Sequence, residues 1–190
     1  MDDAADMPTQ RKLDVDDYHR MAEIGIFRDD DRVELIDGAI IDMAPIGQGH
    51  AATVGGLTRA LVMACGNKAI VWVQNPVRLD RLNEPQPDFA VLRPRPDFYA
   101  TGELPGPVDI LLLVEVADSS LRYDLTVKLP LYARAGIPEL WIVDLKRRAL
   151  DAFRRPAGGQ YAEVATYRPG EHLPLAAAPD ITVRLDLAFA

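Results

Sequence analysis

Three ionisable side chains in the middle of this sequence are of the types that hydrolyse phosphodiester bonds when they share a site. Asp88 follows a proline at the start of an apolar segment, Glu115 ends the longest apolar run, and Lys128 follows on a helix-like stretch. Paired carboxylates suit a hard, oxygen-preferring cation such as Mg²⁺. A nearby lysine stabilises developing negative charge or positions a water molecule. Together they are the groups that metal-assisted hydrolysis of a phosphodiester requires.

The same three residues also have an ordinary structural interpretation, because Asp, Glu and Lys are common in all proteins. In that interpretation Asp88 caps a turn, Glu115 pairs with an arginine, and Lys128 is a solvated residue on a helix. The spacing alone leaves both interpretations open.

The elements around Glu115 predict a strand, a helix and a second strand in succession. The run 110–114 is apolar without alternation, which is typical of a strand buried on both faces. Residues 124–136 place apolar side chains at helical spacing, with Asp124 as the expected cap and a kink expected at Pro130. Residues 140–143 are another apolar strand. Such a unit sets two parallel strands side by side, and sites in these sheets gather where strands end. We therefore expect the chemistry near Glu115.

The rest of the chain predicts one mixed α/β domain over residues 1–190, with 1–12 as a flexible tail. Asp-Gly between two short apolar segments predicts a hairpin over 32–43. Proline and glycine predict a surface loop over 93–107. The other expected elements are a helix over 14–24 capped by Asp14, a helix over 50–64, strands at 69–73, 77–79, 88–92 and 181–185, and a hairpin over 149–166.

Composition narrows the functional classes. The chain has 190 residues and 48% hydrophobic residues, enough for a sizeable core. Its single cysteine, Cys65, excludes an intramolecular disulfide and a cysteine-built zinc site, and fits a reducing compartment such as the cytoplasm. We expect no signal peptide and no membrane span. The formal net charge of −8 argues against a protein that simply coats nucleic acid.

Several segments spread over the chain share the pattern of one known family. They are Glu34-Leu-Ile-Asp-Gly38, His50, Pro87-Asp88, Val114-Glu115-Val116, Tyr123-Asp124 with Lys128, and Tyr132-Ala-Arg-Ala-Gly-Ile-Pro-Glu-Leu-Trp-Ile-Val-Asp144. These segments resemble the Uma family of predicted bacterial endonucleases, long grouped as a domain of unknown function in the PD-(D/E)xK superfamily. The resemblance covers about residues 13–185 and is most specific over 132–144. It implies a restriction-endonuclease-like fold: a mixed central sheet flanked by helices, with an N-terminal helix and hairpin and extra C-terminal strands.

The resemblance also implies a role for each matching residue. Asp88 and Glu115 correspond to the two acidic metal ligands of the superfamily, and the main-chain carbonyl of Val116 to a third ligand. The usual catalytic lysine two residues after the second acid is absent, because that position is Ala117. Lys128 on the following helix corresponds to it instead.

Two further residues match the family at the edges of the predicted site. His50 resembles the histidine that some relatives add to the metal, although a histidine there can also cap a helix or lie at the surface. Glu34 matches a family acid that assists the reaction, although it can also pair across its hairpin. Tyr132 is interpreted as a packing residue.

The resemblance therefore implies an Mg²⁺- or Mn²⁺-dependent endonuclease that hydrolyses DNA as a homodimer. The net negative charge and the displaced lysine motivate an alternative, a nuclease-like fold that binds a nucleic acid or a protein without cutting. A structural or regulatory homodimer formed through the apolar hairpins is a second alternative.

Overall fold

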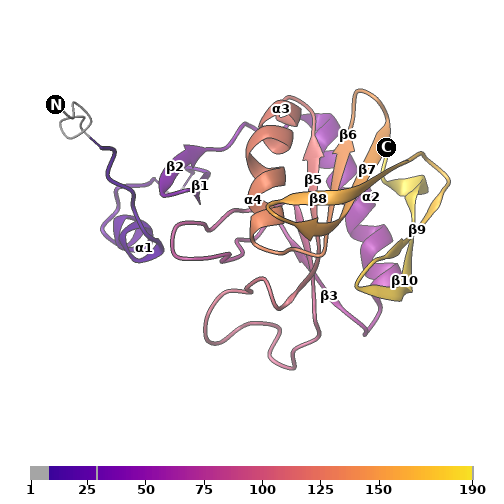
Figure 1. Ribbon diagram of the computed structural model, residues 1–190, viewed down its shortest axis with the longest axis horizontal. Helices are drawn as coiled ribbons and strands as arrows, with labels where there is room; N and C mark the ends of the chain where they lie inside the picture. Colours follow the sequence, from indigo (N-terminus) through magenta and orange to yellow (C-terminus); the bar gives the residue numbers. More distant parts are fainter. Residues whose placement is uncertain (1–8, 29, 190) are drawn as a thin grey trace.

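The centre of the protein is a six-stranded mixed sheet, seen in a computed structural model that describes residues 9–28 and 30–189 (Figure 1). All neighbouring strands are antiparallel except β5 and β6, which are parallel. With helices on both sides of the sheet, this architecture confirms the predicted mixed α/β class. In spatial order the strands are β3 (Ile70–Val73), β4 (Phe89–Leu92), β5 (Ile110–Ala117), β6 (Glu139–Asp144), β7 (Ala149–Ala157) and β8 (Gln160–Tyr167).

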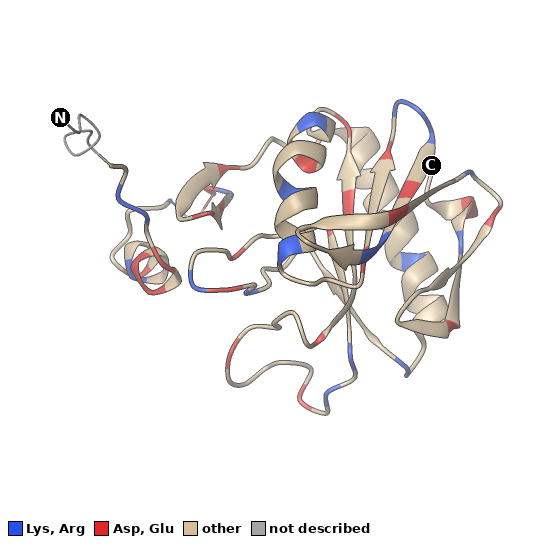
Figure 2. Cartoon of the chain, viewed as in Figure 1, with Lys and Arg blue, Asp and Glu red and all other residues tan. Residues whose placement is uncertain are grey.

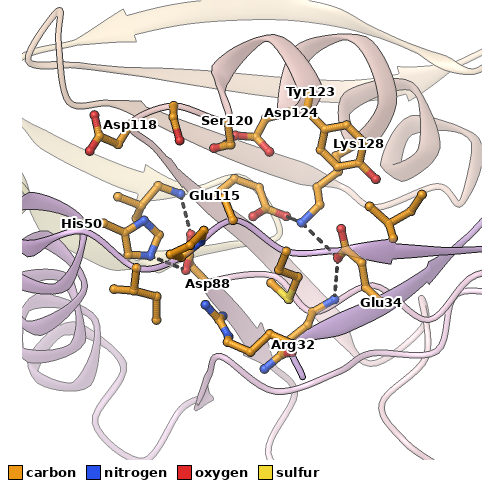
Figure 3. A pocket seen from close by; sticks show the side chains of 18 of the residues that line it. Arg32, Glu34, His50, Asp88, Glu115, Asp118, Ser120, Tyr123, Asp124 and Lys128 are labelled. Carbon is orange, nitrogen blue, oxygen red and sulfur yellow. Dashed lines mark hydrogen bonds and ion pairs between the residues drawn. The ribbon is translucent and has the colours of Figure 1, made fainter. Parts of the chain in front are cut away.

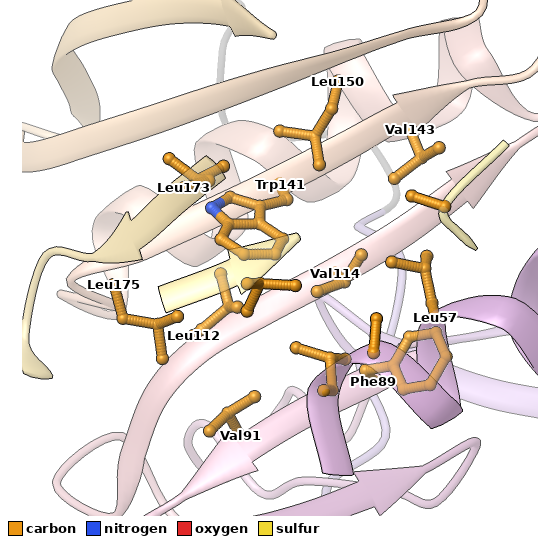
Figure 4. Close-up of a cluster of buried hydrophobic side chains, with 14 of the residues drawn as sticks. Leu57, Phe89, Val91, Leu112, Val114, Trp141, Val143, Leu150, Leu173 and Leu175 are labelled. Atoms are coloured by element: carbon orange, nitrogen blue, oxygen red, sulfur yellow. The ribbon is translucent and has the colours of Figure 1, made fainter. Parts of the chain in front are cut away.

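Apolar layers cover both faces of the sheet, because side chains alternate along each strand. In β5, Leu112 and Val114 belong to the cluster that packs under α2 (Gln48–Cys65), together with Trp141 of β6 (Figure 4). The two-stranded sheet of β9 (His172–Leu175) and β10 (Ala178–Arg184) completes this layer. Leu113 of β5 belongs to the opposite layer, which includes residues of α4 (Leu129–Arg134).

The connection from β5 to β6 is helical but not uniformly α-helical. It consists of α3 (Leu121–Tyr123), the π-helical turn η1 (Asp124–Lys128) and α4. In the π turn the Leu129 amide donates to the Asp124 carbonyl, five residues back. This turn comes directly before Pro130, which has no amide proton to continue an α-helical ladder. The irregularity expected at the proline is therefore a widened turn, a feature frequent at functional sites.

The N-terminal helix and hairpin lie beside the central sheet (Figure 1). The helix α1 (Val15–Glu23) begins at the predicted cap Asp14, whose side chain accepts the amides of residues 16 and 17. The hairpin of β1 (Val33–Ile36) and β2 (Ala39–Asp42) turns at Asp-Gly as expected. Leu35 exchanges two main-chain hydrogen bonds with Glu84. The segment before β4 therefore holds the hairpin against the sheet.

Three sequence predictions are wrong in detail. Residues 77–79 form no strand, because their amides donate to carbonyls of the loop residues 83, 85 and 105 rather than to a neighbouring strand. Strand β5 continues past Glu115 to Ala117, since its pairing with β6 extends that far. The helix after β5 starts at Leu121, which leaves Asp124 inside it rather than at its cap.

Two other predictions concern the N-terminal tail and membrane-spanning helices. Most of the tail predicted over 1–12 falls on residues 1–8, which lie outside the described residues. Within the described part of the chain, no helix has the length and apolarity needed to cross a membrane.

Two adjacent glycines of α2 give a matched test of how the C-terminal segment packs. The 3₁₀ turn η2 (Leu185–Leu187) crosses α2 at Gly56, where an added Cβ would collide with the Leu187 carbonyl oxygen, whereas a Cβ on Gly55 meets open space. Gly55→Ala is expected to stabilise the protein by about 0.5–1 kcal/mol through helix propensity. Gly56→Ala is expected to destabilise it by about 1–3 kcal/mol, since backbone cannot move aside easily. Urea unfolding of both variants measures the difference, and equal effects would contradict this packing.

Candidate active site

A cavity of about 270 Å³ opens where the hairpin, the start of α2, the ends of β4 and β5 and the π turn meet (Figure 3). It is lined by all the residues that the sequence predicted for the site, which come from five segments far apart in the chain. These are Glu34 of β1, His50 of α2, Asp88 before β4, Glu115 and Val116 of β5, and Lys128 of η1.

Asp88 is fixed by three hydrogen bonds. Its Oδ1 accepts from His50 Nε2 at 2.9 Å and from Gln74 Nε2 at 3.2 Å, and its Oδ2 accepts from the Val116 amide at 2.8 Å. The pairing of β4 with β5 stops at Phe89, and Pro87 cannot donate to a sheet ladder. The Asp88 carboxylate therefore accepts the first β5 amide beyond the ladder. Of its roughly four acceptor positions, one is left for a ligand.

Glu115 is buried, and its two oxygens differ. Oε1 accepts a hydrogen bond from Tyr132 Oη at 2.6 Å and lies 3.1 Å from Lys128 Nζ. Among the residues that the structure describes, none donates a hydrogen bond to Oε2. Burial raises the pKa of Glu115 to about 8, against the influence of Lys128 and with a further contribution from nearby carboxylates such as Asp124.

Lys128 lies between two carboxylates and is only 4% exposed. Its Nζ is 3.2 Å from Glu34 Oε2 and 3.1 Å from Glu115 Oε1. Burial disfavours its charge, but the surrounding carboxylates, Glu115 first, outweigh burial and raise its pKa above the ordinary value. A buried ammonium ion needs such partners. The interpretation of Lys128 as a solvated helix residue is therefore wrong.

The structural interpretations of Glu34 and Glu115 also predicted the wrong interaction partners. Glu34 pairs with Lys128 and accepts the Gln86 amide at 3.1 Å, rather than pairing across its hairpin. Glu115 pairs with this lysine, not with an arginine.

His50 contacts Asp88 directly. The hydrogen bond to Asp88 raises the pKa of His50, while burial and the charge of Arg32 oppose the rise. Because a carboxylate only accepts, His50 Nε2 must carry the donated proton. The ring therefore positions Asp88 in this arrangement, and a role for His50 as a metal ligand stays a prediction.

The sequence assigns no role to four residues of the site, although Tyr123 and Asp124 lie in a segment that matches the family, and it misjudges a fifth. Tyr132 was assigned to packing; it is fully buried, but it also donates to Glu115. Its place one helical turn after Lys128 was the available signal. For Gln74, Arg32, Tyr123 and Asp124 no spacing rule pointed to the cavity, because the contacts depend on how the segments pack.

The cavity has an excess of negative charge. Six carboxylates but only three basic side chains line it. Two of the basic residues, His50 and Lys128, are paired with carboxylates, whereas no ion pair involves Arg32 among the described residues. Outside the site charges of both signs are interspersed, with acidic residues prevailing on α1 (Figure 2). An anionic ligand therefore needs a cation to enter this cavity.

Comparison with known proteins places this site in a family. The sequence model of Uma2, described as "Putative restriction endonuclease", matches residues 15–188. The chain belongs to the Uma2 family. The matched range includes every predicted site residue and confirms the resemblance seen in the sequence. The description of the family supports a nuclease function for this chain.

A solved structure shares the fold. It is described as a putative nuclease belonging to DUF820 from Anabaena variabilis, and the alignment covers 93% of this chain and 97% of that chain. The TM-score is 0.69 at 15% sequence identity. This likeness confirms the predicted nuclease-like architecture. No curated protein matches the chain.

The raised pKa of Glu115 predicts that the metal-free protein loses stability as the pH rises. In the unfolded chain the pKa of this carboxyl is near 4.5, whereas burial raises it to about 8 in the folded protein. The stabilisation by the bound proton is therefore complete below the unfolded pKa and is lost as the pH rises through the folded one.

Urea unfolding in a chelator, from about pH 5 to about pH 9, compares the wild type with Glu115→Gln. Glutamine resembles the protonated acid in shape but does not titrate. The stability of the wild type relative to this variant is expected to fall over that range. A difference that is independent of pH would contradict the raised pKa.

Proposed function

We propose that the cavity is the active site of a divalent-cation-dependent endonuclease that hydrolyses phosphodiester bonds in DNA. The observation that carries this proposal is the meeting of Asp88, Glu115 and Lys128 in one cavity, although they come from three separate segments. Membership of a family described as restriction endonucleases supports the choice of reaction and substrate.

The donor atoms favour Mg²⁺ or Mn²⁺. Asp88 keeps one acceptor position and Glu115 Oε2 is not engaged by the described residues, so two carboxylate oxygens are available. In the described part of the chain, no three His, Cys, Asp or Glu side chains lie close enough together to hold an ion by themselves. The carbonyl of Val116 and water molecules therefore complete the proposed coordination. Mg²⁺ suits such a site because it usually retains several waters.

A bound cation of this kind lowers the pKa of water and neutralises charge on a phosphate. The protein residues fix the geometry around it. The donors on Asp88 hold that carboxylate rigidly, and Lys128 holds Glu115 and Glu34 together. The Lys128 ammonium also lies where it can orient the attacking water or stabilise negative charge that develops nearby. Glu34 and His50 assist through their contacts with Lys128 and Asp88.

We propose that the Arg32 guanidinium contacts the substrate. It lines the cavity, and its charge acts on the His50–Asp88 pair. Lys128 already pairs with two buried carboxylates, whereas the guanidinium of Arg32 has no ion pair among the described residues. A guanidinium also matches two oxygens of a phosphate at once.

A second candidate function is nucleic-acid or protein binding without cleavage. The observation that favours it is that Lys128 already pairs with both Glu34 and Glu115. For the proposed nuclease, cleavage of both strands of a duplex would require two active sites, and we therefore propose a homodimer. Light scattering tests this oligomeric state.

Metal binding and cleavage are expected to depend on both acidic ligands. Calorimetric titration of Mg²⁺ and Mn²⁺ should show binding to the wild type, and Asp88→Asn and Glu115→Gln should weaken it and lower DNA cleavage by more than about 100-fold. Asp180→Asn removes the same charge from an exposed site on β10 and should change neither. Equal cleavage by all three variants would refute the proposed active site.

Replacing the substrate-facing cation is expected to weaken DNA binding rather than metal binding. Arg32→Ala should lower the affinity for a DNA oligonucleotide in Ca²⁺ by about 10-fold or more, the usual loss for a charged hydrogen bond. Arg59→Ala on the exposed face of α2 is the matched control. Equal loss of affinity in the two variants would show that Arg32 acts only through general charge.

A further inference from the structure

One buried polar atom in the cavity wall has no partner. Among the described residues, the Tyr123 hydroxyl is the single buried side-chain nitrogen or oxygen without a hydrogen bond. Folded proteins satisfy nearly all such groups, because an unsatisfied one costs about 1–3 kcal/mol. The exception therefore calls for a physical reason.

The other tyrosine hydroxyls of the folded core show that this chain ordinarily satisfies them. Tyr132 donates to Glu115 at 2.6 Å, Tyr161 to the Ile137 carbonyl at 3.0 Å, and Tyr99 to the Arg93 carbonyl at 3.0 Å. Of these four tyrosines, Tyr123 is the one whose residue lines the cavity. Its position, rather than poor packing in general, distinguishes it.

Tyr123 ends α3 and comes directly before the π turn that presents Lys128. Its side chain lies next to Lys128 and on the same side of the cavity as Glu34 (Figure 3). Burial raises the pKa of Tyr123, and the carboxylates Glu34 and Glu115 raise it further. The hydroxyl therefore keeps its proton and is a hydrogen-bond donor, not a nucleophile.

We propose that the Tyr123 hydroxyl donates this hydrogen bond to a phosphate oxygen of the bound substrate. The inference rests on the proposed nuclease function and adds a residue that contacts the substrate to those that hold the metal. A cavity with six carboxylates repels a phosphate, so a donor that is already desolvated is an effective partner for it. No described residue accepts the proton of this hydroxyl, and Glu34 and Glu115 pair with Lys128 instead.

Replacing Tyr123 by phenylalanine separates this role from a structural one. Tyr123→Phe removes the unsatisfied hydroxyl, so the free energy of unfolding is expected to stay the same or to increase. Cleavage of a DNA oligonucleotide in Mg²⁺ is expected to fall about 10- to 100-fold in kcat/KM, the loss of a hydrogen bond to a charged group. Calorimetric affinity for Mg²⁺ should not change, since Tyr123 supplies no ligand.

Tyr161→Phe is the matched control, because its hydroxyl is satisfied and lies between β8 and the start of β6. It should lower stability and leave cleavage unchanged. A Tyr123→Phe variant that cleaves like the wild type would overturn this inference alone. Loss of stability equal to that of Tyr161→Phe would also overturn it, since the hydroxyl would then be bonded within the fold. A wild-type protein that neither cleaves nor binds DNA would overturn the proposed function and this inference together.

Discussion

The candidate site depends on one buried ion pair system, in which Lys128 lies between Glu34 and Glu115. Two carboxylates at this depth repel each other and lose hydration, and a single ammonium ion compensates for both. The same lysine joins the hairpin, the central strand and the helix that follows it. Removal of Lys128 would leave two uncompensated buried acids, so the lysine supports the fold whether or not it also takes part in a reaction.

Local backbone irregularities put this lysine in place. A regular α-helix through residues 121–134 would carry Lys128 in a different orientation, because a π turn adds one residue to the turn. Pro130 favours this widening by withholding an amide proton. Strand β5, in turn, supplies Glu115 on the face toward α4, where Tyr132 and Lys128 meet it. The irregular helix and the regular strand thus define the cavity wall together.

Much of this arrangement could be predicted from the sequence. The Asp-Gly hairpin, the cap of α1 and the parallel pair β5–β6 follow from local patterns and were found as predicted. The family resemblance identified residues that do converge in one cavity. Local patterns could not show that Lys128 is buried, or that Tyr123 is left unsatisfied, because both depend on the packing of distant segments. The strand predicted at 77–79 is wrong for the same reason. Apolar and polar side chains do alternate there, but the amides bond to loop carbonyls that local patterns could not identify.

The end of the β4–β5 ladder has a consequence for how this site can vary. Asp88 directly precedes Phe89, the last paired residue of β4, and its carboxylate accepts a hydrogen bond from the Val116 amide of β5. Strand register therefore fixes the position of Asp88 relative to Glu115. Insertions in the loop 93–107 leave that register unchanged and should be tolerated. A slip of β4 by one residue would instead turn Asp88 to the opposite face of the sheet. Loops around the sheet can therefore vary widely in length while the distance in space between Asp88 and Glu115 stays constant.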